Sequence, residues 1–309
     1  MKIAMFGTGG VGGYYGGLLA KHGHDVWFIA RGAHLEAIRE NGLQVKSIHG
    51  DFEVVPAQAT DDPAAVGTVD LVIFCPKTYH TDEAALQLRP MIGSDTVVMS
   101  LQNGVDAAER IGAVIGMEHV IGGVTQVSSA VEAPGVIRQV SQFRRIIFGE
   151  LDGTISGRVR SIEAALQGTG IAVEISEDIS RALWTKLVFI SAASGLGSLT
   201  RLPMGEYRSV PETRAMIIGL MREVEAVARA LGVRLEADVV EKSLAFMDNA
   251  APTIRASMQL DVEAGRRSEI ESMIGVIGRK GRETGVPTPV ADMIYASLLP
   301  VELKARQSA

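Results

Sequence analysis

The sequence predicts an α/β domain built on a parallel sheet, followed by an all-helical domain. Up to about residue 175, short runs of β-branched and aromatic residues alternate with helical segments, as in repeated strand–helix–strand units. After that point the strand pattern stops and helical patterns continue almost to the end of the chain. A chain of 309 residues also suggests two domains, at about 150 residues per domain. We place the boundary near Ser176, which gives domains 1–176 and 177–309.

The first domain carries eight strand-like runs. They lie at residues 2–6, 25–30, 69–75, 96–101, 119–124, 135–139, 145–149 and 171–175. Helical segments at residues 11–22, 34–41 and 155–167 lie among these runs, and a glycine follows the second as a stop signal. We expect all eight strands to belong to one sheet.

The second domain begins with a helical run around residues 182–190 and contains four later helical segments. These are residues 212–231, 237–249, 269–284 and 289–299, separated by proline and glycine. Apolar residues in the first of these four recur every three or four positions, which predicts a helix with one apolar face. That face suits packing inside one chain or against a second copy in a homodimer. Residues 303–309 are predicted to be a polar, frayed tail.

Composition excludes several classes of protein. The formal charge is −6, with 30 Lys and Arg against 36 Asp and Glu, and no basic block suggests a nucleic-acid partner. Cys75 is the only cysteine, which fits a reducing cytoplasm. We expect no secretory signal at the N-terminus. We also expect no membrane span, because Lys186 and several Ser and Gly interrupt the apolar stretch 183–199.

Glycine is enriched near the N-terminus, where seven of the 34 glycines lie between Gly7 and Gly17. Six consecutive residues match the pattern G-x-G-x-x-G: Gly7, Thr8, Gly9, Gly10, Val11 and Gly12. The motif follows a predicted strand and opens a predicted helix, which is the context of a Rossmann-type dinucleotide site. Its glycines permit the tight turn, the approach of a pyrophosphate and close packing of the helix on the strand. A purely structural glycine turn is the weaker alternative.

The end of the second strand indicates which nicotinamide cofactor is bound. An acidic residue there would bind the ribose 2′-hydroxyl of NADH, whereas an arginine accommodates the 2′-phosphate of NADPH. Arg31 follows this strand, and Asp25 lies at its opposite end. The sequence therefore favours NADPH, with a solvated surface role as the alternative for Arg31.

Polar residues follow two further strands at the edge where open parallel sheets bind ligands. Asn103, in the turn 101–105, carries both a donor and an acceptor, but Asn-Gly is also a common turn pair. Lys77, just past the strand that ends at Cys75, is likewise either a ligand-binding residue or an ordinary loop residue. Cys75 is interpreted as a buried small residue, because no histidine accompanies it in the sequence as a partner for a nucleophile.

Two charged residues stand out in the second domain. Lys186 lies in an apolar helical run, where desolvation lowers the pKa of an amine and favours a role as an acid; a lysine with its head in water is the alternative. Glu269 opens a predicted helix, where a carboxylate also complements the helix dipole. The six histidines are scattered and predict no metal site.

Several motifs, in the same order along about the whole chain, together resemble the ketopantoate reductases, also called 2-dehydropantoate 2-reductases. They are the glycine motif, Leu101-Gln102-Asn103-Gly104-Val105, Trp184-Thr185-Lys186, and the run 256–261 followed by Glu269-Ile270-Glu271. The resemblance implies a cytoplasmic oxidoreductase of pantothenate biosynthesis. In such an enzyme a Rossmann domain holds NADPH, a helical domain closes over the oxo acid, and the active site lies in the cleft between the domains.

The resemblance also implies roles for individual residues. Lys186 would be the general acid, and Glu269 would bind both the substrate hydroxyl and the cofactor ribose. Asn103 would bridge cofactor and substrate, and Lys77 would support the nicotinamide ribose. Substrate contacts would come from Ser257 and Ser194. Hydride attack on a ketone creates negative charge on oxygen, which an ammonium group can stabilise and then protonate.

One departure from the family pattern concerns the substrate. Asparagines typically follow the catalytic lysine by four and eight residues, and here those positions hold Ile190 and Ser194. Isoleucine cannot make the hydrogen bond of an amide, and discrimination between substrates often depends on such bonds. The resemblance as a whole still implies reduction of 2-dehydropantoate to pantoate, and this is the expected function. The alternatives are reduction of a different 2-oxo acid and a non-catalytic NADP(H)-binding sensor.

Overall fold

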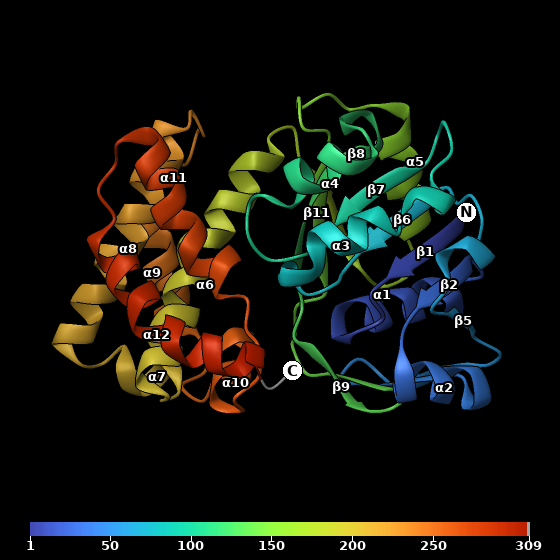
Figure 1. Ribbon diagram of the computed structural model, residues 1–309, viewed down its shortest axis with the longest axis horizontal. Helices are drawn as coiled ribbons and strands as arrows, with labels where there is room; N and C mark the ends of the chain where they lie inside the picture. The colour runs from blue at the N-terminus through green and yellow to red at the C-terminus, as the bar shows by residue number, and fades with distance from the viewer. Residues whose placement is uncertain (308–309) are drawn as a thin grey trace. The chain divides into compact units, whose positions relative to one another are not determined.

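An eight-stranded sheet forms the centre of the N-terminal half in the computed structural model, which describes residues 1–307 (Figure 1). In chain order its strands are β1 (Lys2–Phe6), β2 (Asp25–Ile29), β5 (Gln58–Thr60), β6 (Leu71–Phe74), β7 (Val97–Ser100), β8 (Val120–Gln126), β11 (Arg145–Gly149) and β12 (Ala172–Ile175). Their spatial order is β12-β11-β8-β7-β6-β1-β2-β5. All neighbours pair in parallel except β8 and β11, which are antiparallel.

Helices cover both faces of this sheet, as parallel strands require. The helices are α1 (Gly10–Lys21), α2 (Gly32–Asn41), α3 (Thr81–Leu86), α4 (Ala107–Ile115) and α5 (Gly157–Leu166), with short 3₁₀ turns η1 (Pro63–Ala65), η2 (Thr78–His80), η3 (Arg89–Met91) and η4 (Met117–His119). Alternate residues of β1 enter two different cores. Ile3 and Met5 pack with side chains of α1 and α5, whereas Ala4 and Phe6 pack with those of α3 and α4.

A second sheet of four strands corrects the expectation of a single sheet. It contains β3 (Leu43–Ser47), β4 (Phe52–Val54), β9 (Ser129–Ala133) and β10 (Val136–Gln139), in the order β4-β3-β10-β9. The run predicted at residues 135–139 belongs here, because it forms an antiparallel hairpin with β9 and pairs in parallel with β3. Since this hairpin, and no crossover helix, separates β8 from β11, those two strands pair antiparallel.

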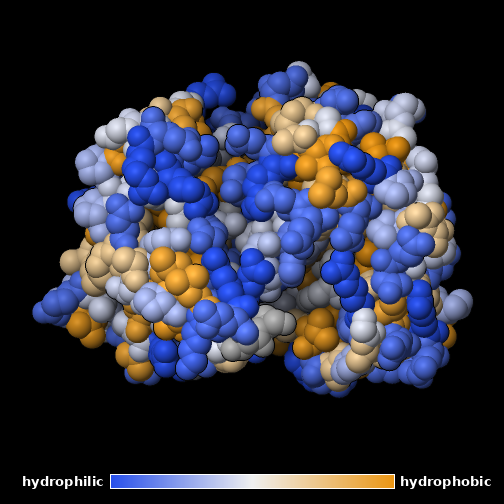
Figure 2. Space-filling model, in the orientation of Figure 1, coloured by the Kyte–Doolittle hydropathy of each residue, from blue (hydrophilic) through white to orange (hydrophobic). Residues whose placement is uncertain are grey.

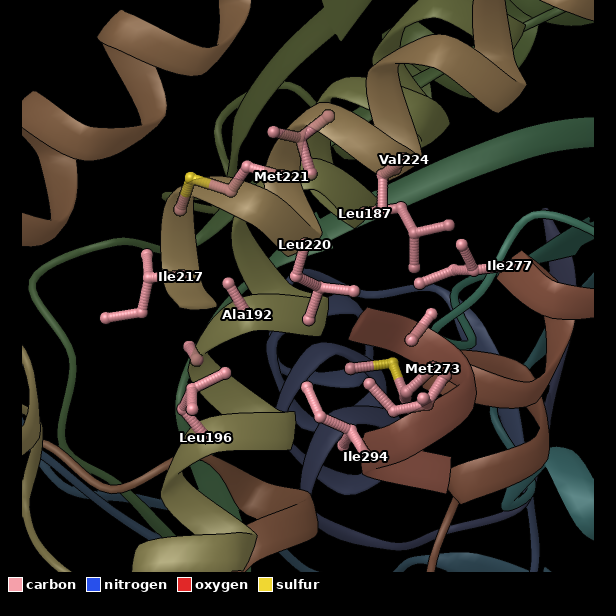
Figure 3. Packing of buried hydrophobic residues seen from close by; sticks show 14 of the residues in the cluster. Leu187, Ala192, Leu196, Ile217, Leu220, Met221, Val224, Met273, Ile277 and Ile294 are labelled. Atoms are coloured by element: carbon pink, nitrogen blue, oxygen red, sulfur yellow. The ribbon is translucent and has the colours of Figure 1, made fainter. Parts of the chain in front are cut away.

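The C-terminal half contains helices alone within its described residues. They are α6 (Ile179–Thr200), α7 (Met204–Tyr207), α8 (Pro211–Ala230), α9 (Val239–Asn249), α10 (Ser257–Glu263), the π-helical segment η5 (Glu271–Gly275), α11 (Val276–Thr284) and α12 (Pro289–Gln307). Leu187, Leu196, Leu220, Met273 and Ile294 converge from four of these elements on one buried core (Figure 3). The predicted fold class, a parallel-sheet domain followed by an all-helical one, is confirmed.

The chain divides into two compact units. The first comprises Met1–Gln102 and Asp106–Ile179, and the second comprises Asn103–Val105 with the residues from Ser180 onward. The loop Asn103–Val105 thus groups with the helical unit, although it follows strand β7 closely in the sequence. Its residue Val105 packs against the core of that unit. Hydrophilic side chains cover most of the face seen in Figure 2, with apolar ones scattered among them.

The expectation of a frayed tail is wrong for residues 303–307. Helix α12 continues past Pro300 to Gln307, and Glu302 and Ala305 are buried on its inner side. Sequence polarity predicts an exposed tail here, but Arg306 of this segment is bonded to Glu302 and Glu271 inside the unit. Residues 308 and 309 of the predicted tail lie outside the described chain.

Helix α6 meets the length and composition of a membrane span, alone among the described helices. The helix has 22 residues and extends beyond the apolar stretch 183–199 at both ends. Most of its apolar stretch is buried inside the structure, which is how the core helix of a globular domain behaves.

Candidate active site

The glycine loop joins β1 to α1, and three of its glycines are required by close packing. A Cβ on Gly7, whose φ is +93°, would lie 2.8 Å from the backbone nitrogen of Pro76. A Cβ on Gly12 would collide with the carbonyl of Gly7, and one on Gly10 would collide with the carbonyl of Ser129. Gly9 differs, because a Cβ there would have nothing within 4 Å.

The space beside Gly9 and the start of α1 suit a bound pyrophosphate. Gly9 is the N-cap of α1, no side chain caps the helix there, and its first turn carries no acidic residue. The first N–H groups of a helix have no partner within it and attract anions. The loop thus satisfies the structural requirements of a dinucleotide site.

The other motif residues serve the loop itself. Thr8 is buried, and both its Oγ1 and its backbone nitrogen donate to the carbonyl of Ile29, at 3.0 and 2.9 Å. Its side chain therefore ties the loop to the end of β2. Val11 is half-buried and packs against the core on the same side of the sheet.

Arg31 is exposed at the N-cap of α2, where its Nη2 donates to Oε1 of Gln87 at 3.0 Å. Lys77 is half-buried just after β6, at the start of η2. Burial raises the pKa of the Cys75 thiol, which keeps it protonated and unsuited to nucleophilic chemistry. Each of these residues therefore follows a strand at the edge predicted from the sequence.

Gln102 is a positioning residue that the sequence reasoning missed. Its Nε2 donates to the carbonyl of Pro76 at 2.8 Å and to Oγ1 of Thr81 at 2.9 Å, and its Oε1 accepts from Ser100. Gln102 thereby holds the segment after β6 to the segment after β7. The sequence signal was a glutamine between an apolar strand and Asn103; that the glutamine is buried and therefore needs partners is known only from the structure.

Asn103, Lys186 and Glu269 interact within the second unit. Nδ2 of Asn103 donates to Oε2 of Glu269 at 3.2 Å, and Glu269 is nearly fully buried. Lys186 lies on α6, where burial lowers the pKa of its amine to about 8, while the nearby charge of Glu269 acts in the opposite direction. The site thus contains one amide, one carboxylate and one amine whose pKa is lowered to about 8.

The two predicted serines have no hydrogen bond to these three side chains among the described residues. Ser194 follows Lys186 by eight residues on α6 and is fully buried, and its hydroxyl has no hydrogen-bond partner among the described residues. Ile190, four residues after Lys186, is half-buried. Ser257 is exposed as the first residue of α10. The structure does not link either hydroxyl to Asn103, Lys186 or Glu269.

Comparisons with known proteins match both halves of the chain. Residues 3–153 match the family model described as ketopantoate reductase PanE/ApbA, and residues 178–302 match the model of its C-terminal domain. A 2-dehydropantoate 2-reductase of Mesorhizobium japonicum is 32% identical over 96% of each chain. An uncharacterized oxidoreductase of Bacillus subtilis, YkpB, is 30% identical over 96% of this chain and 98% of its own.

A solved structure agrees with these matches. The crystal structure of a PanE/ApbA family ketopantoate reductase from Ralstonia eutropha superposes with a TM-score of 0.92 at 34% identity, covering 99% of this chain and 100% of the other. Fold and matches together define the class: the protein is an NAD(P)-type oxidoreductase with a sheet domain and a helical domain. More particularly, the chain belongs to the ketopantoate reductase PanE/ApbA family.

Proposed function

We propose that the protein reduces a 2-oxo acid with NADPH, and that the substrate is 2-dehydropantoate, giving pantoate for pantothenate biosynthesis in the cytoplasm. The observation that carries the proposal is Lys186, an amine with a pKa near 8 beside the carboxylate of Glu269. A group that titrates close to the working pH is well suited to general acid catalysis. The relative from Mesorhizobium japonicum, a 2-dehydropantoate 2-reductase, supports the choice of substrate.

The side chains of the second unit account for the proton and for orientation. When bound, NADPH would supply a hydride for the carbonyl carbon of the oxo acid. Lys186, protonated at neutral pH, stabilises the negative charge on the carbonyl oxygen and transfers a proton from Nζ to it. The resulting neutral amine regains its proton from solvent. Glu269 binds the substrate hydroxyl, and its bond with Asn103 orients both side chains.

The first unit supplies the nucleotide site in this proposal. The backbone around Gly9 and the start of α1 would hold the pyrophosphate, since that region is open and uncapped. Arg31 would bind the 2′-phosphate after leaving Gln87, and Lys77 would support the nicotinamide ribose. These assignments favour NADPH over NADH.

A second candidate keeps the chemistry and changes the substrate. Ile190 and Ser194 occupy the α6 positions at which the family pattern has asparagines, and Ile190 offers no hydrogen bond. A site built to bind a hydroxyl rejects analogues without it, and loss of the amide removes that preference. A less hydroxylated 2-oxo acid would then be the better substrate.

A substrate panel separates these candidates. The purified full-length protein is mixed with NADPH and each of several 2-oxo acids, and the loss of nicotinamide absorbance is followed. We expect turnover, with 2-dehydropantoate having the highest kcat/KM. A higher kcat/KM for an oxo acid without the hydroxyl supports the second candidate. NADPH binding without turnover of any oxo acid would contradict both and identify a nucleotide sensor.

A further inference from the structure

The residue before Glu269 is held by the last helix. Ser268 donates two hydrogen bonds to Oε2 of Glu302 on α12, from its backbone nitrogen at 2.8 Å and from Oγ at 2.7 Å. Both residues are almost completely buried, at 2% and 3% exposure. Hydrogen bonds to a carboxylate are among the stronger ones, and removing this acceptor would leave two donors unsatisfied in the interior. Glu302 therefore fixes the backbone immediately before Glu269.

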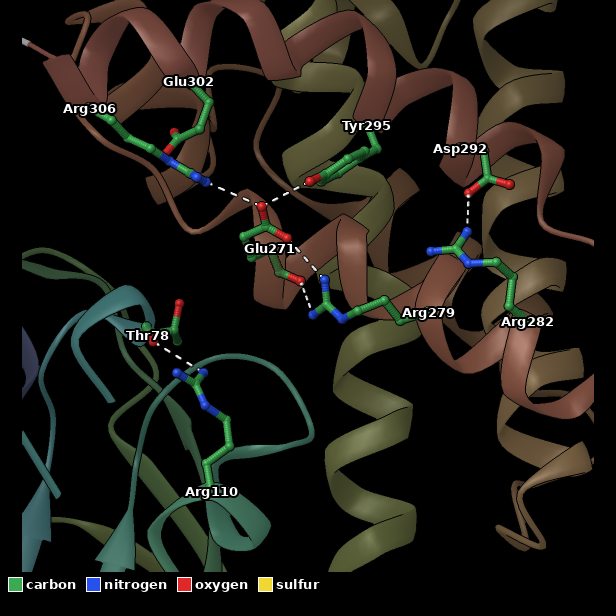
Figure 4. A network of polar contacts seen from close by, with 9 residues as sticks. All are labelled: Thr78, Arg110, Glu271, Arg279, Arg282, Asp292, Tyr295, Glu302 and Arg306. Atoms are coloured by element: carbon green, nitrogen blue, oxygen red, sulfur yellow. Dashed lines mark hydrogen bonds and ion pairs between the residues drawn. The ribbon is translucent and has the colours of Figure 1, made fainter. Parts of the chain in front are cut away.

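The segment after Glu269 is held by the same helix. The Glu271 carboxylate accepts hydrogen bonds from Tyr295 at 2.9 Å and Arg306 at 3.2 Å, both on α12, and from Arg279 of α11 at 2.9 Å (Figure 4). Burial raises the pKa of Glu271, but these bonds outweigh burial and hold the pKa below its usual range. The carboxylate therefore stays charged at neutral pH and keeps all three partners.

Arg306 connects the two anchors. Its Nε donates to Oε1 of Glu302 at 2.9 Å, and its Nη2 donates to Glu271. We call Ser268, Glu271, Glu302 and Arg306 the C-terminal clamp. The clamp encloses the start of η5, a π-helical turn of a kind that is rare and often found at functional sites. The clamp therefore anchors the backbone on both sides of Glu269, just where this turn begins.

We propose that Glu302 and Arg306 are positioning residues that hold Glu269 in place beside Asn103 and Lys186. The inference rests on the proposed function, because it assigns Glu269 a part in the reaction. Neither side chain is placed against the reacting atoms. They act through Ser268 and Glu271, the near neighbours of Glu269 in sequence, while Asn103 orients the carboxylate itself.

Variants of Glu302 test the clamp through kinetics. Glu302→Ala is expected to lower kcat/KM for the oxo acid about 10-fold. It is also expected to lower the pH at which reduction declines, because a displaced Glu269 no longer raises the pKa of Lys186. Glu302→Gln keeps an acceptor for Ser268 and should recover most of this loss. Arg306→Met, at a more exposed position, should give a smaller change in the same direction.

Glu223 provides a matched control at the other end of α12. Its carboxylate accepts hydrogen bonds from the backbone nitrogens of Val290 at 2.7 Å and Ala291 at 2.8 Å, so it also anchors this helix. Glu223→Ala should lower the melting temperature without moving the pH profile. If Glu302→Ala and Glu223→Ala lower stability alike and both leave kcat/KM and the pH profile unchanged, the positioning role is wrong.

Amide hydrogen exchange tests the clamp independently of turnover. Residues 268–273 should exchange faster in Glu302→Ala and Arg306→Met than in the wild type or in Glu223→Ala. Equal exchange in all four proteins overturns the clamp, even in an active enzyme. If the wild type turns over no oxo acid while the exchange difference is present, the proposed function fails and the clamp stands as a device that orders Glu269.

Discussion

The two units form their sites from different parts of the chain. In the first unit the glycine loop is one continuous stretch that uses its backbone, and its key feature is the empty space beside Gly9. In the second unit the site consists of side chains, and the hydrogen-bonded pair Asn103 and Glu269 is separated by 166 residues in sequence. A backbone site is specified locally, whereas a side-chain site depends on the packing of a whole domain. The two should therefore respond differently to substitution.

The largest expected effect is on turnover through Lys186. Lys186→Met should lower kcat by roughly 10²- to 10⁴-fold, the usual contribution of general acid catalysis. The affinity for NADPH, measured by fluorescence titration, should stay within about twofold. The melting temperature should not fall, because the substitution removes an amine whose charge is disfavoured by burial. Lys242→Met, at an exposed position of α9, serves as the control and should leave kcat unchanged.

The next effect concerns nucleotide binding through Gly9. Gly9→Ala should weaken NADPH binding at least about 10-fold while the melting temperature stays nearly constant, because a Cβ there meets no protein atom but occupies the proposed pyrophosphate space. Gly157→Ala, at another open glycine of the first unit, should change neither quantity. Gly12→Ala should instead destabilise the fold, since its Cβ would collide with Gly7. Unchanged NADPH affinity in Gly9→Ala would contradict the assignment of the loop.

A smaller effect is expected on cofactor choice. Arg31→Ala should weaken NADPH binding about 10-fold and leave NADH binding nearly unchanged, as expected for loss of a charged hydrogen bond worth about 1.5 kcal/mol or more. Arg39→Ala on the same helix, where the side chain donates to the carbonyl of Ala59, is the control. A wild-type protein that prefers NADH would exclude this role for Arg31.

The smallest effect is a shift in pH dependence. The charge of Glu269 raises the pKa of Lys186, so Glu269→Gln should lower that pKa below about 8. Because the protonated amine is the active form in reduction, the decline in kcat/KM should then begin at lower pH than in the wild type. Rates measured between pH 6 and 9 would show the shift. A break at unchanged or higher pH would mean that Glu269 does not act on Lys186 through its charge.

In the first unit, the sequence predicted the conformation of the glycine loop more accurately than the arrangement of the strands in sheets. The spacing of Gly7, Gly9 and Gly12 predicts a tight turn between a strand and a helix, and the structure has this turn between β1 and α1. The second sheet was missed because β4 has only three residues and β9 is mostly exposed, so neither length nor apolar pattern marks these strands. Strand pairing also depends on partners distant in the sequence, which a local pattern does not reveal.

In the second unit, the secondary structure was predicted better than the contacts of the site. Its longer helices were predicted as helical segments, whereas the short α7 and α10 were not. Lys186 stood out as a charge within an apolar run. The contact between Asn103 and Glu269 could not be derived, because it requires a loop from the sheet region to group with the helical unit. The ordered end of α12 was missed because charged residues such as Glu302 and Arg306 predict a solvated segment, and the sequence does not reveal their buried partners.

The pH dependence of the wild-type reaction tests the central claim most directly, namely that Lys186 is the proton donor. The account predicts that kcat/KM for the oxo acid, at saturating NADPH, is constant at neutral pH and falls as pH rises through about 8, because the amine loses its proton. Oxidation of the hydroxy acid should rise over the same interval, because it needs the neutral amine. A reduction rate that stays constant from pH 7 to above 9 would contradict the assignment of Lys186.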